Sequence, residues 1–352
     1  MHCQCVHEFG KPLQAEDRAD MEPQGSEVIL KVTAAGVCHT DLHLREGGFD
    51  LGHGKRMAYK DRGVSLPVVP GHETTGTLVA AGPDAGDIDP DAQYVVYPWC
   101  GCGTCPSCQR GEEQLCATPA FLGIQSDGGY ATHIRVPHPR YLFDIRDLDP
   151  AFAAPLACSG LTTYAALKKV EHLLAEHRLV LIGGGGLGLM CLQLLKARGA
   201  KAPVVVDIDP SKRAAAREAG AAAAVDPKDD DAIAQIHKAC GGAPMGAIDF
   251  VGAPQTAALG FDVLGRGGTL VMVGLFGGAA PWALPLIPAK SITVCGSYTG
   301  SLSDFAQLME LVHSGALTAI PSKTWPLSQA EEVMNMLEEG KILGRALLDP
   351  KR

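Results

Sequence analysis

Hydrophobic and polar positions follow two different patterns along this chain, and the change comes near residue 155. In the first part, short alternating runs such as EVILKV (27–32) and TGTLVAAG (75–82) are separated by turns rich in glycine and proline. Such runs are typical of β-strands. From LVLIG (179–183) to GTLVMVG (268–274), apolar strand-like runs alternate with stretches of helical period. This alternation predicts an α/β unit built on a parallel, doubly wound sheet.

Beyond residue 290, the pattern predicts one more strand within SITVCGS (291–297) and two helices, over 304–315 and 331–340. A chain of 352 residues is longer than one ordinary core supports, so we expect two domains. The apolar stretches at 179–195 and 268–289 are interrupted by glycines or prolines. They are therefore interpreted as buried strands and turns rather than membrane spans.

Net charge, the polar N-terminus and the cysteine content limit which binding partners and which cellular compartment are expected. A net charge of −9 argues against nucleic acid or an anionic membrane as the main partner. The first 25 residues are polar and contain no secretory signal, so we expect a cytoplasmic protein. In a reducing compartment the twelve cysteines are expected to be thiols or metal ligands rather than disulfides.

Four cysteines lie within one short loop, at Cys102, Cys105, Cys108 and Cys116. Four thiolates in one loop can wrap a tetrahedral ion and leave no open position, which is typical of structural zinc. A ferredoxin-type iron–sulfur cluster would need a shorter last interval followed by proline, whereas Ala117 follows here. Disulfides would need an oxidising compartment and a different geometry. The spacing therefore favours a structural zinc site.

A dinucleotide site is indicated by Gly183, Gly185 and Gly188, which form G-x-G-x-x-G between an apolar run and a helical stretch. Such glycines permit close approach of a pyrophosphate to a helix N-terminus. Asp207 ends the next apolar run, and its carboxylate would bind the ribose hydroxyls and repel a 2′-phosphate. The pattern favours NAD, although two nearby cations, Arg213 and the candidate coenzyme contact Lys212, keep NADP open. A glycine-rich packing turn is the alternative.

A second metal site is suggested by GVCHTDLH (36–43) and PGHETTG (70–76), because a hydride cofactor needs a group that activates its substrate. A catalytic zinc ion takes three protein ligands and one open position, and two cysteines with one histidine suit alcohol chemistry. Spacing alone does not prove that Cys38 and His72 meet. The N-terminal run MHCQCVHEFG could also bind metal, but a first strand with incidental thiols is the favoured interpretation.

Taken together, these motifs resemble the zinc-dependent medium-chain alcohol dehydrogenases, and most closely their tetrameric bacterial and archaeal NAD-dependent branch. SDGGYATH (126–133), APLACSGLTTY (154–164) and GRALLD (344–349) complete the series in the family's order. The resemblance covers essentially the whole chain. It implies a GroES-like, β-rich catalytic domain over 1–153 and 292–352, and an NAD-binding Rossmann domain over 154–291.

The resemblance also implies the ligands of a catalytic zinc ion. They are Cys38, His72 and Cys158, with Glu73 as a fourth ligand in some states. Asp41 resembles the residue that orients His72. Without the family pattern, Cys158 would read as a buried apolar thiol.

Further roles follow from matching positions. Thr40 would hydrogen-bond the alcohol, and His43 would carry its proton outward through the coenzyme ribose. Trp99 would form a wall of the substrate site, although a core tryptophan is a comparable interpretation. His39 and Arg345 would contact the pyrophosphate. The positions expected to line the nicotinamide are Thr162, Val251, Gly274 and Leu275.

The implied activity is NAD-dependent oxidation of primary or secondary alcohols, aliphatic or aromatic, to aldehydes or ketones, and the reverse reduction. Hydride would leave an alkoxide held on zinc. A polyol or amino-alcohol dehydrogenase of the same fold is the alternative, followed by a non-catalytic sensor of NAD(H) or metal. The implied assembly is a homotetramer, with a dimer as the alternative. The segment 49–65 could line the pocket mouth or a subunit contact.

Overall fold

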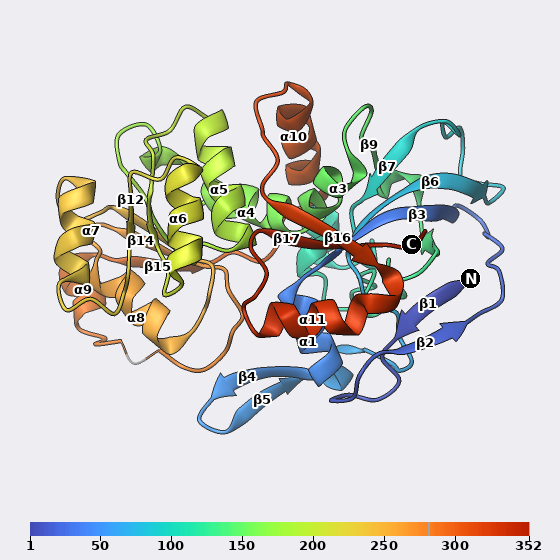
Figure 1. Cartoon of the computed structure of the whole chain (residues 1–352), viewed down its shortest axis with the longest axis horizontal. Helices are drawn as coiled ribbons and strands as arrows, with labels where there is room; N and C mark the ends of the chain where they lie inside the picture. The colour runs from blue at the N-terminus through green and yellow to red at the C-terminus, as the bar shows by residue number, and fades with distance from the viewer. Residues whose placement is uncertain (281, 352) are drawn as a thin grey trace.

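Two large β-sheets organise this chain, whose computed structural model describes residues 1–280 and 282–351 (Figure 1). The first is a sheet of six parallel strands in the order β12-β11-β10-β13-β14-β15. Its strands are β10 (Val180–Ile182), β11 (Val204–Val206), β12 (Ala223–Val225), β13 (Gly246–Asp249), β14 (Thr269–Met272) and β15 (Thr293–Gly296). This order confirms the predicted doubly wound parallel sheet.

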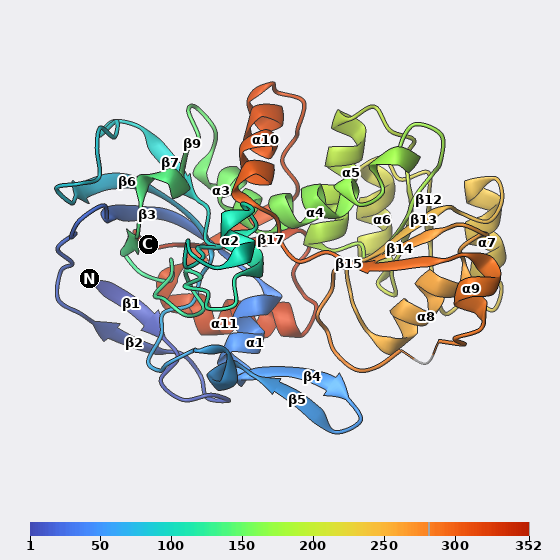
Figure 2. The same ribbon diagram turned by 180° about the vertical axis from the view of Figure 1, so that it is seen from behind.

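Both faces of the parallel sheet are buried, as its apolar sequence requires. Leu181 belongs to one core cluster, whereas its neighbours Val180 and Ile182 belong to another on the opposite face. The helices that link the strands are α5 (Gly186–Ala197), α6 (Pro210–Glu218), α7 (Ala232–Cys240), α8 (Pro254–Asp262) and α9 (Leu286–Lys290). They surround the sheet at one end of the molecule (Figures 1 and 2).

The second sheet has seven strands and fills the other end of the molecule. Its path is β16-β17-β3-β6-β7-β9, with β8 paired to β3; β16 and β17 are parallel and the other pairs are antiparallel. The strands are β3 (Val28–Val37), β6 (Glu73–Ala81), β7 (Gln93–Val96), β8 (His133–Val136), β9 (Leu142–Asp144), β16 (Ser322–Pro326) and β17 (Arg345–Asp349). The chain therefore returns to its first half after it completes the parallel sheet.

Smaller elements surround these sheets. Two hairpins consist of β1 (His2–Cys5) with β2 (Gln14–Asp17) and β4 (Gly48–Gly52) with β5 (Lys55–Ala58). The remaining α-helices are α1 (His39–Glu46), α2 (Pro106–Gln109), α3 (Pro150–Ala153), α4 (Ser159–Lys168), α10 (Leu302–His313) and α11 (Ala330–Glu338). The last two confirm the helices expected near 304–315 and 331–340. In the described part of the chain, no helix is both long and apolar enough to cross a membrane.

The boundary expected at residue 291 is wrong by one strand. β15 pairs with β14, and Ile292 is part of the core cluster under the parallel sheet. The run SITVCGS (291–297) was correctly expected to contain a strand. However, strand-forming residues predict only that this run forms a strand. They do not predict which sheet the strand joins, because tertiary packing determines the neighbouring strand.

Candidate active site and metal centres

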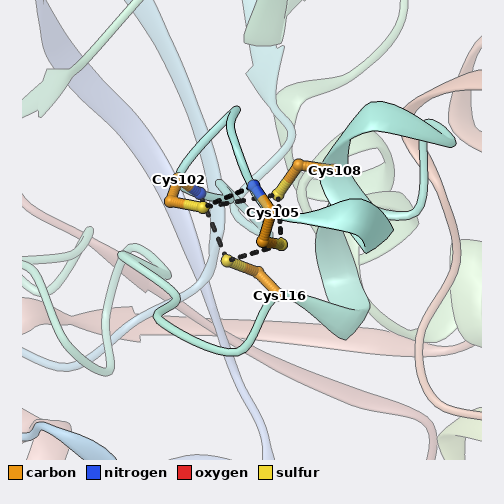
Figure 3. A group of neighbouring side chains, drawn as sticks. All are labelled: Cys102, Cys105, Cys108 and Cys116. Atoms are coloured by element: carbon orange, nitrogen blue, oxygen red, sulfur yellow. Dashed lines mark hydrogen bonds between the residues drawn. The ribbon is translucent and has the colours of Figure 1, made fainter.

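The four-cysteine loop closes its thiols around one point, as Figure 3 shows. Ligand atoms of Cys102, Cys105, Cys108 and Cys116 all lie within 4.8 Å of one another. The Sγ atoms of Cys105 and Cys108 are 3.5 Å apart, and those of Cys105 and Cys116 are 3.8 Å apart. These separations suit four sulfurs on a single tetrahedral ion. Cys100 lies outside this group.

Local hydrogen bonds prepare this loop for anionic sulfur. The backbone N–H groups of Cys102 and Cys105 donate to Cys116 Sγ and Cys102 Sγ, each at 3.3 Å. A hydrogen bond from Thr104 and then backbone N–H groups lower the pKa of Cys102 to about 5. By contrast, burial raises the pKa of Cys108 to about 12. The set can therefore release protons when a cation binds.

A second group gathers residues that are far apart in sequence. Ligand atoms of Cys38, His72, Glu73 and Cys158 lie within 4.8 Å of one another. Cys38 caps the start of α1, and Glu73 begins β6 directly after His72. Cys158 lies between the short helical turn Ala154–Ala157 and α4. The Sγ atoms of Cys38 and Cys158 are 3.8 Å apart. The structure thus brings together the four residues that spacing alone could not connect.

The donor set fits a metal ion. Nε2 of His72 and Oε2 of Glu73 are buried and have no hydrogen-bond partner among the described residues. An unpaired buried polar atom is costly, and a metal ion at this point would pair both. A hydrogen bond joins the two thiols and shifts their pKa values in opposite directions. It holds the pKa of Cys38 well below its usual value and raises the pKa of Cys158.

Asp41 fixes the histidine and the cysteine of this group. Its Oδ1 lies 3.3 Å from His72 Nδ1, and its Oδ2 accepts the backbone N–H of Cys38 at 2.9 Å. Burial lowers the pKa of His72, but the Asp41 carboxylate and the Cys38 sulfur together outweigh burial and raise the pKa overall. Tyr130 donates its hydroxyl to Asp41 Oδ2 at 3.1 Å. The Asp41 carboxylate therefore orients the imidazole, leaving Nε2 free for an ion.

Glu73 is tied to Arg345 behind the metal-ligand group. Their side chains form a buried ion pair, with Arg345 Nη2 donating to Glu73 Oε1. Burial raises the pKa of Glu73 to about 7, although the Arg345 charge opposes this rise. Gly36 makes room for the carboxylate, since a Cβ there would stand 2.8 Å from Glu73 Cβ. The carboxylate is thus held close to the thiols.

The remaining residues expected at the substrate lie beside this group. Thr40 Oγ1 is 3.9 Å from Cys38 Sγ. The ring of His43 is partly buried and lies 5.7 Å from the ring of Phe49 in β4. Trp99 is 1% exposed, its ring lies 5.4 Å from that of His72, and it donates Nε1–H to Ala157 O at 3.1 Å. Both interpretations of Trp99, core residue and site wall, are compatible with this position.

The glycine turn follows β10 and leads into α5. A Cβ at Gly188 would collide with the carbonyl of Gly183, so only glycine allows this helix to start so close to the strand. Among the described residues, no atom beyond the adjoining ones lies within 4 Å of a Cβ position at Gly185, which leaves the turn open for a ligand. The side chain of Arg345 passes Gly186, with Cδ 2.7 Å from the Cβ position. An anion at this helix N-terminus would meet both N–H groups and a cation.

Asp207 lies next to this turn, immediately after β11. Its Oδ2 accepts the N–H of Gly184 at 2.7 Å, and its Oδ1 accepts that of Asp209 at 2.8 Å. Arg213 donates to the backbone carbonyl of Asp207 at 2.8 Å and pairs with Asp226 at 2.9 Å. Lys212 is a partly buried residue in the first turn of α6. Of the two cations that follow β11, Lys212 and Arg213, Arg213 is therefore already paired within the protein.

The residues expected at the nicotinamide occupy loops at the carboxyl ends of the parallel strands. Val251 follows β13, and Gly274 and the exposed Leu275 follow β14. The two loops are joined by a hydrogen bond from Phe276 N to Val251 O at 3.1 Å. Thr162 lies on α4, one turn after Cys158, and His39 is exposed at the start of α1. Ligands of doubly wound sheets bind at this edge.

Sequence reasoning missed several residues that shape these sites. Asp249 is fully buried and accepts the N–H groups of Val251 and Gly252 at 2.8 and 3.0 Å. Glu113 accepts bonds from Gly101 N and the Tyr141 hydroxyl at 2.8 and 2.6 Å, which fastens the cysteine loop. An acidic residue at the end of an apolar strand was the available signal for Asp249. Nothing local marks Glu113.

Comparisons with known proteins extend these observations. The family described as alcohol dehydrogenase GroES-like domain matches residues 24–147, and the zinc-binding dehydrogenase family matches residues 186–314. An NAD-dependent alcohol dehydrogenase of Sulfurisphaera tokodaii is 39% identical over 345 residues, which cover 97% of this chain and 98% of that protein.

Other relatives are more distant but also full length. The solved alcohol dehydrogenase of the archaeon Aeropyrum pernix has a TM-score of 0.90 at 30% identity, covering 99% of this chain and 100% of that one. A D-arabinose 1-dehydrogenase (NADP(+)) of Saccharolobus solfataricus is 31% identical, covering 98% of this chain and 96% of that protein. The likeness thus spans both sheets.

Proposed function

The chain belongs to the zinc-dependent medium-chain alcohol dehydrogenases, and on this premise we propose that it oxidises alcohols with NAD and reduces the corresponding carbonyls. The observation that carries the proposal is the group of Cys38, His72, Cys158 and Glu73, which converges on one point next to a glycine turn. A redox coenzyme site and a Lewis-acid site side by side suit hydride transfer.

The residues present fit a zinc ion at this point. Cys38, His72 and Cys158 supply two sulfurs and one nitrogen, and the Glu73 carboxylate stands close enough to enter or leave the ligand set. When bound, zinc stabilises negative charge on the substrate oxygen and the nicotinamide accepts the hydride. Asp41 keeps the His72 ring in the orientation that presents Nε2.

Proton movement is assigned to this chain's own side chains. Thr40, next to Cys38, accepts the hydroxyl proton of the alcohol. With the coenzyme bound, His43, one helical turn further along α1, would receive that proton by way of the ribose and release it to solvent. Burial lowers the pKa of His43, so its imidazole is neutral and able to accept a proton near pH 7.

We assign the coenzyme to the edge formed by the glycine turn and Asp207. The N-terminus of α5 and Arg345 bind the pyrophosphate, with His39 as a second contact. The Asp207 carboxylate binds ribose hydroxyls and disfavours a 2′-phosphate. Because Arg213 is engaged with Asp226, Lys212 is left as the nearby cation that could serve NADP. The contacts proposed for the nicotinamide are Thr162, Val251, Gly274 and Leu275.

The four-cysteine loop is proposed to hold a second, structural zinc ion. Its four sulfurs leave no position for substrate. The loop is fastened by Glu113 rather than by core packing, so the ion is expected to stabilise the loop and not to take part in hydride transfer.

A sugar or polyol is the second candidate substrate, because the arabinose dehydrogenase relative aligns over nearly the whole chain. Against it, the ring of Trp99 and that of Tyr298, 6.2 Å away, give the site an aromatic side that favours apolar alcohols. We further propose a cytoplasmic location, where thiolate ligands stay reduced, and a homotetramer, with a dimer as the alternative. Light scattering of the purified chain decides the assembly.

The first experiment is formation of NADH with a panel of primary, secondary, benzylic and polyol substrates, with NADP in parallel. We expect turnover with NAD and an apolar alcohol, and its loss after the zinc is removed by a chelator. Turnover that survives complete zinc removal, or a lower KM for NADP than for NAD, would contradict the assignment. No turnover with zinc and NADH both bound would favour a non-catalytic sensor.

A further inference from the structure

The N-terminal hairpin gathers a third set of metal-binding side chains. In the antiparallel pairing of β1 with β2, Cys3 lies opposite Glu16, and Cys5 lies two residues further along the same strand. Side chains at alternate positions share one face of a strand, so these three residues point to the same side. Both cysteines are fully buried. One ligand atom from each of the three lies within 4.8 Å of the others.

The distance between the two sulfurs is that of ligands on one ion. Cys3 Sγ and Cys5 Sγ are 3.5 Å apart. Two metal–sulfur bonds of about 2.3 Å at a tetrahedral angle place their sulfurs ~3.8 Å apart. A disulfide would need a separation of about 2.05 Å. The pair is therefore spaced for metal binding without any rearrangement of the strand.

Burial raises the pKa of the Cys3 and Cys5 thiols, and the charge of Arg18 opposes this rise. Arg18 donates Nη2–H to Cys5 Sγ at 3.3 Å, and its Nε pairs with the Glu16 carboxylate. Two buried apolar thiols would need no guanidinium donor, whereas metal thiolates are stabilised by such N–H groups. The negative charges of two thiolates and one carboxylate are balanced by a divalent ion together with Arg18.

The site also has a path to solvent and a group that orients its carboxylate. His7 Nε2 lies 2.7 Å from Glu16 Oε2, and the two side chains are 33% and 26% exposed. An ion can therefore enter past Glu16, whose outer oxygen the imidazole holds in place.

We propose that Cys3, Cys5 and Glu16 form a third metal site, which takes a divalent zinc-like ion with water as the fourth ligand. On binding, the S–H bonds of both cysteines break, two metal–sulfur bonds form, and the two protons leave to solvent without any change of oxidation state. The proposal is independent of the dehydrogenase reaction, because none of these residues belongs to the catalytic group.

A metal at this position would fasten β2 to β1, the strand that is bonded to the body of the protein. Gln4 N donates to Tyr130 O and Val6 N donates to Val68 O, both at 2.9 Å, so β1 already lies against two inner segments. Cross-linking β1 to β2 through the ion would hold the hairpin on these segments. Zinc would then stabilise the native chain by an amount that grows with the logarithm of free zinc above its dissociation constant.

The test is a zinc count on the full-length chain, equilibrated in a metal buffer that holds free zinc in the nanomolar range. Inductively coupled plasma mass spectrometry is expected to find three zinc ions per chain, one for each metal-ligand group. The double variant Cys3→Ala with Cys5→Ala is expected to hold two and to keep wild-type alcohol turnover. Cys191→Ala, which removes a buried free cysteine outside all three groups, is the matched control and keeps three.

The double variant could lose zinc simply because it misfolds. Glu16→Gln is a second test without that risk, because it leaves both thiols and their packing in place. We expect it to fold and to bind the third zinc more than about tenfold more weakly. Two zinc ions in the wild-type chain, three in the double variant, or unchanged affinity in Glu16→Gln would each overturn the proposal. A Cys3–Cys5 disulfide found by mass spectrometry in the freshly purified chain would overturn it as well.

Discussion

Substitution of Cys38 or Cys158 tests the proposed catalytic group most directly. Their sulfurs are 3.8 Å apart, although the two residues are 120 positions apart in the sequence. Cys38→Ala or Cys158→Ala removes one of three metal ligands, so we expect turnover to fall by at least about 10³-fold. NADH binding, measured by fluorescence titration, is expected to survive because the glycine turn is intact. Full activity in either variant would remove the mechanism, and Cys100→Ala serves as a buried-thiol control.

We predict that the fall in the rate of alcohol oxidation at low pH reflects protonation of His43. A proton acceptor must be neutral, and burial lowers the pKa of this imidazole below its usual 6.5. Alcohol oxidation is therefore expected to stay constant as pH falls to about 6.5 and to decline only below the lowered pKa, where His43 is protonated. In His43→Gln the rate falls and this acid limb disappears. An unchanged limb in that variant would assign the titration to another group.

Local patterns could predict many of these residues but not all of them. The cysteine loop and the glycine turn are each contained in fewer than twenty consecutive residues, so their spacing carries the chemistry. Cys158 is 120 residues from Cys38, and only the resemblance to a family connected the two. The pairing of Glu73 with Arg345 spans 272 residues and was not foreseen, since Arg345 was expected only at the pyrophosphate. Long-range partners leave no periodic trace in sequence.

At the scale of elements, the position of α1 depends on a buried arginine that no motif indicates. Arg45 donates to Glu331 Oε1 at 2.8 Å, to Asn335 at 2.7 Å and to Glu338 at 2.7 Å, all on α11. Helix α1 carries Thr40 and His43, the two residues of the proposed proton route. The contact between Arg45 and α11 therefore determines the position of both side chains.

Arg45→Met is therefore predicted to cost about 2 kcal/mol of unfolding free energy, since the acidic partners are half-exposed and can recover water. Urea denaturation gives this value, and kcat is expected to fall more than the coenzyme affinity. Glu338→Ala, which removes only the most exposed partner, is the control and should cost less than about 1 kcal/mol. Equal losses in the two variants would show that the arginine is not the central contact.

Element boundaries were also the least predictable part of the fold. The strand in 291–297 was expected, yet its pairing with β14 rather than with the β-rich sheet was not. Strand propensity describes a half-buried residue environment, and both sheets offer one. The alternation of strands and helices from 179 onward was more informative, because a parallel sheet needs a crossover between each pair of strands.

At the scale of the whole molecule, Arg345 joins the two sheets. It begins β17 in the seven-stranded sheet, pairs with Glu73 behind the metal-ligand group, and passes Gly186 at the start of α5. The two halves also meet through α4, which packs against α5 and α10, and through a hydrogen bond from Gly278 N to Asp50 O at 3.2 Å. One cation therefore serves the metal-ligand group and the coenzyme turn together, so its removal should affect both.

Arg345→Met is predicted to lower the unfolding free energy by roughly 3 kcal/mol, because it leaves the Glu73 carboxylate buried without its cation. It should also weaken NADH binding by about tenfold or more, since an anion at α5 loses its charged partner. Arg345→Lys restores the charge but not the fork of donors, so intermediate values are expected for both quantities. Cys38→Ala, which touches only the metal-ligand group, should leave NADH affinity within a factor of about two. If Arg345→Met destabilises the chain yet binds NADH as the wild type does, the arginine acts on Glu73 alone, and the link between the sheets is structural rather than functional.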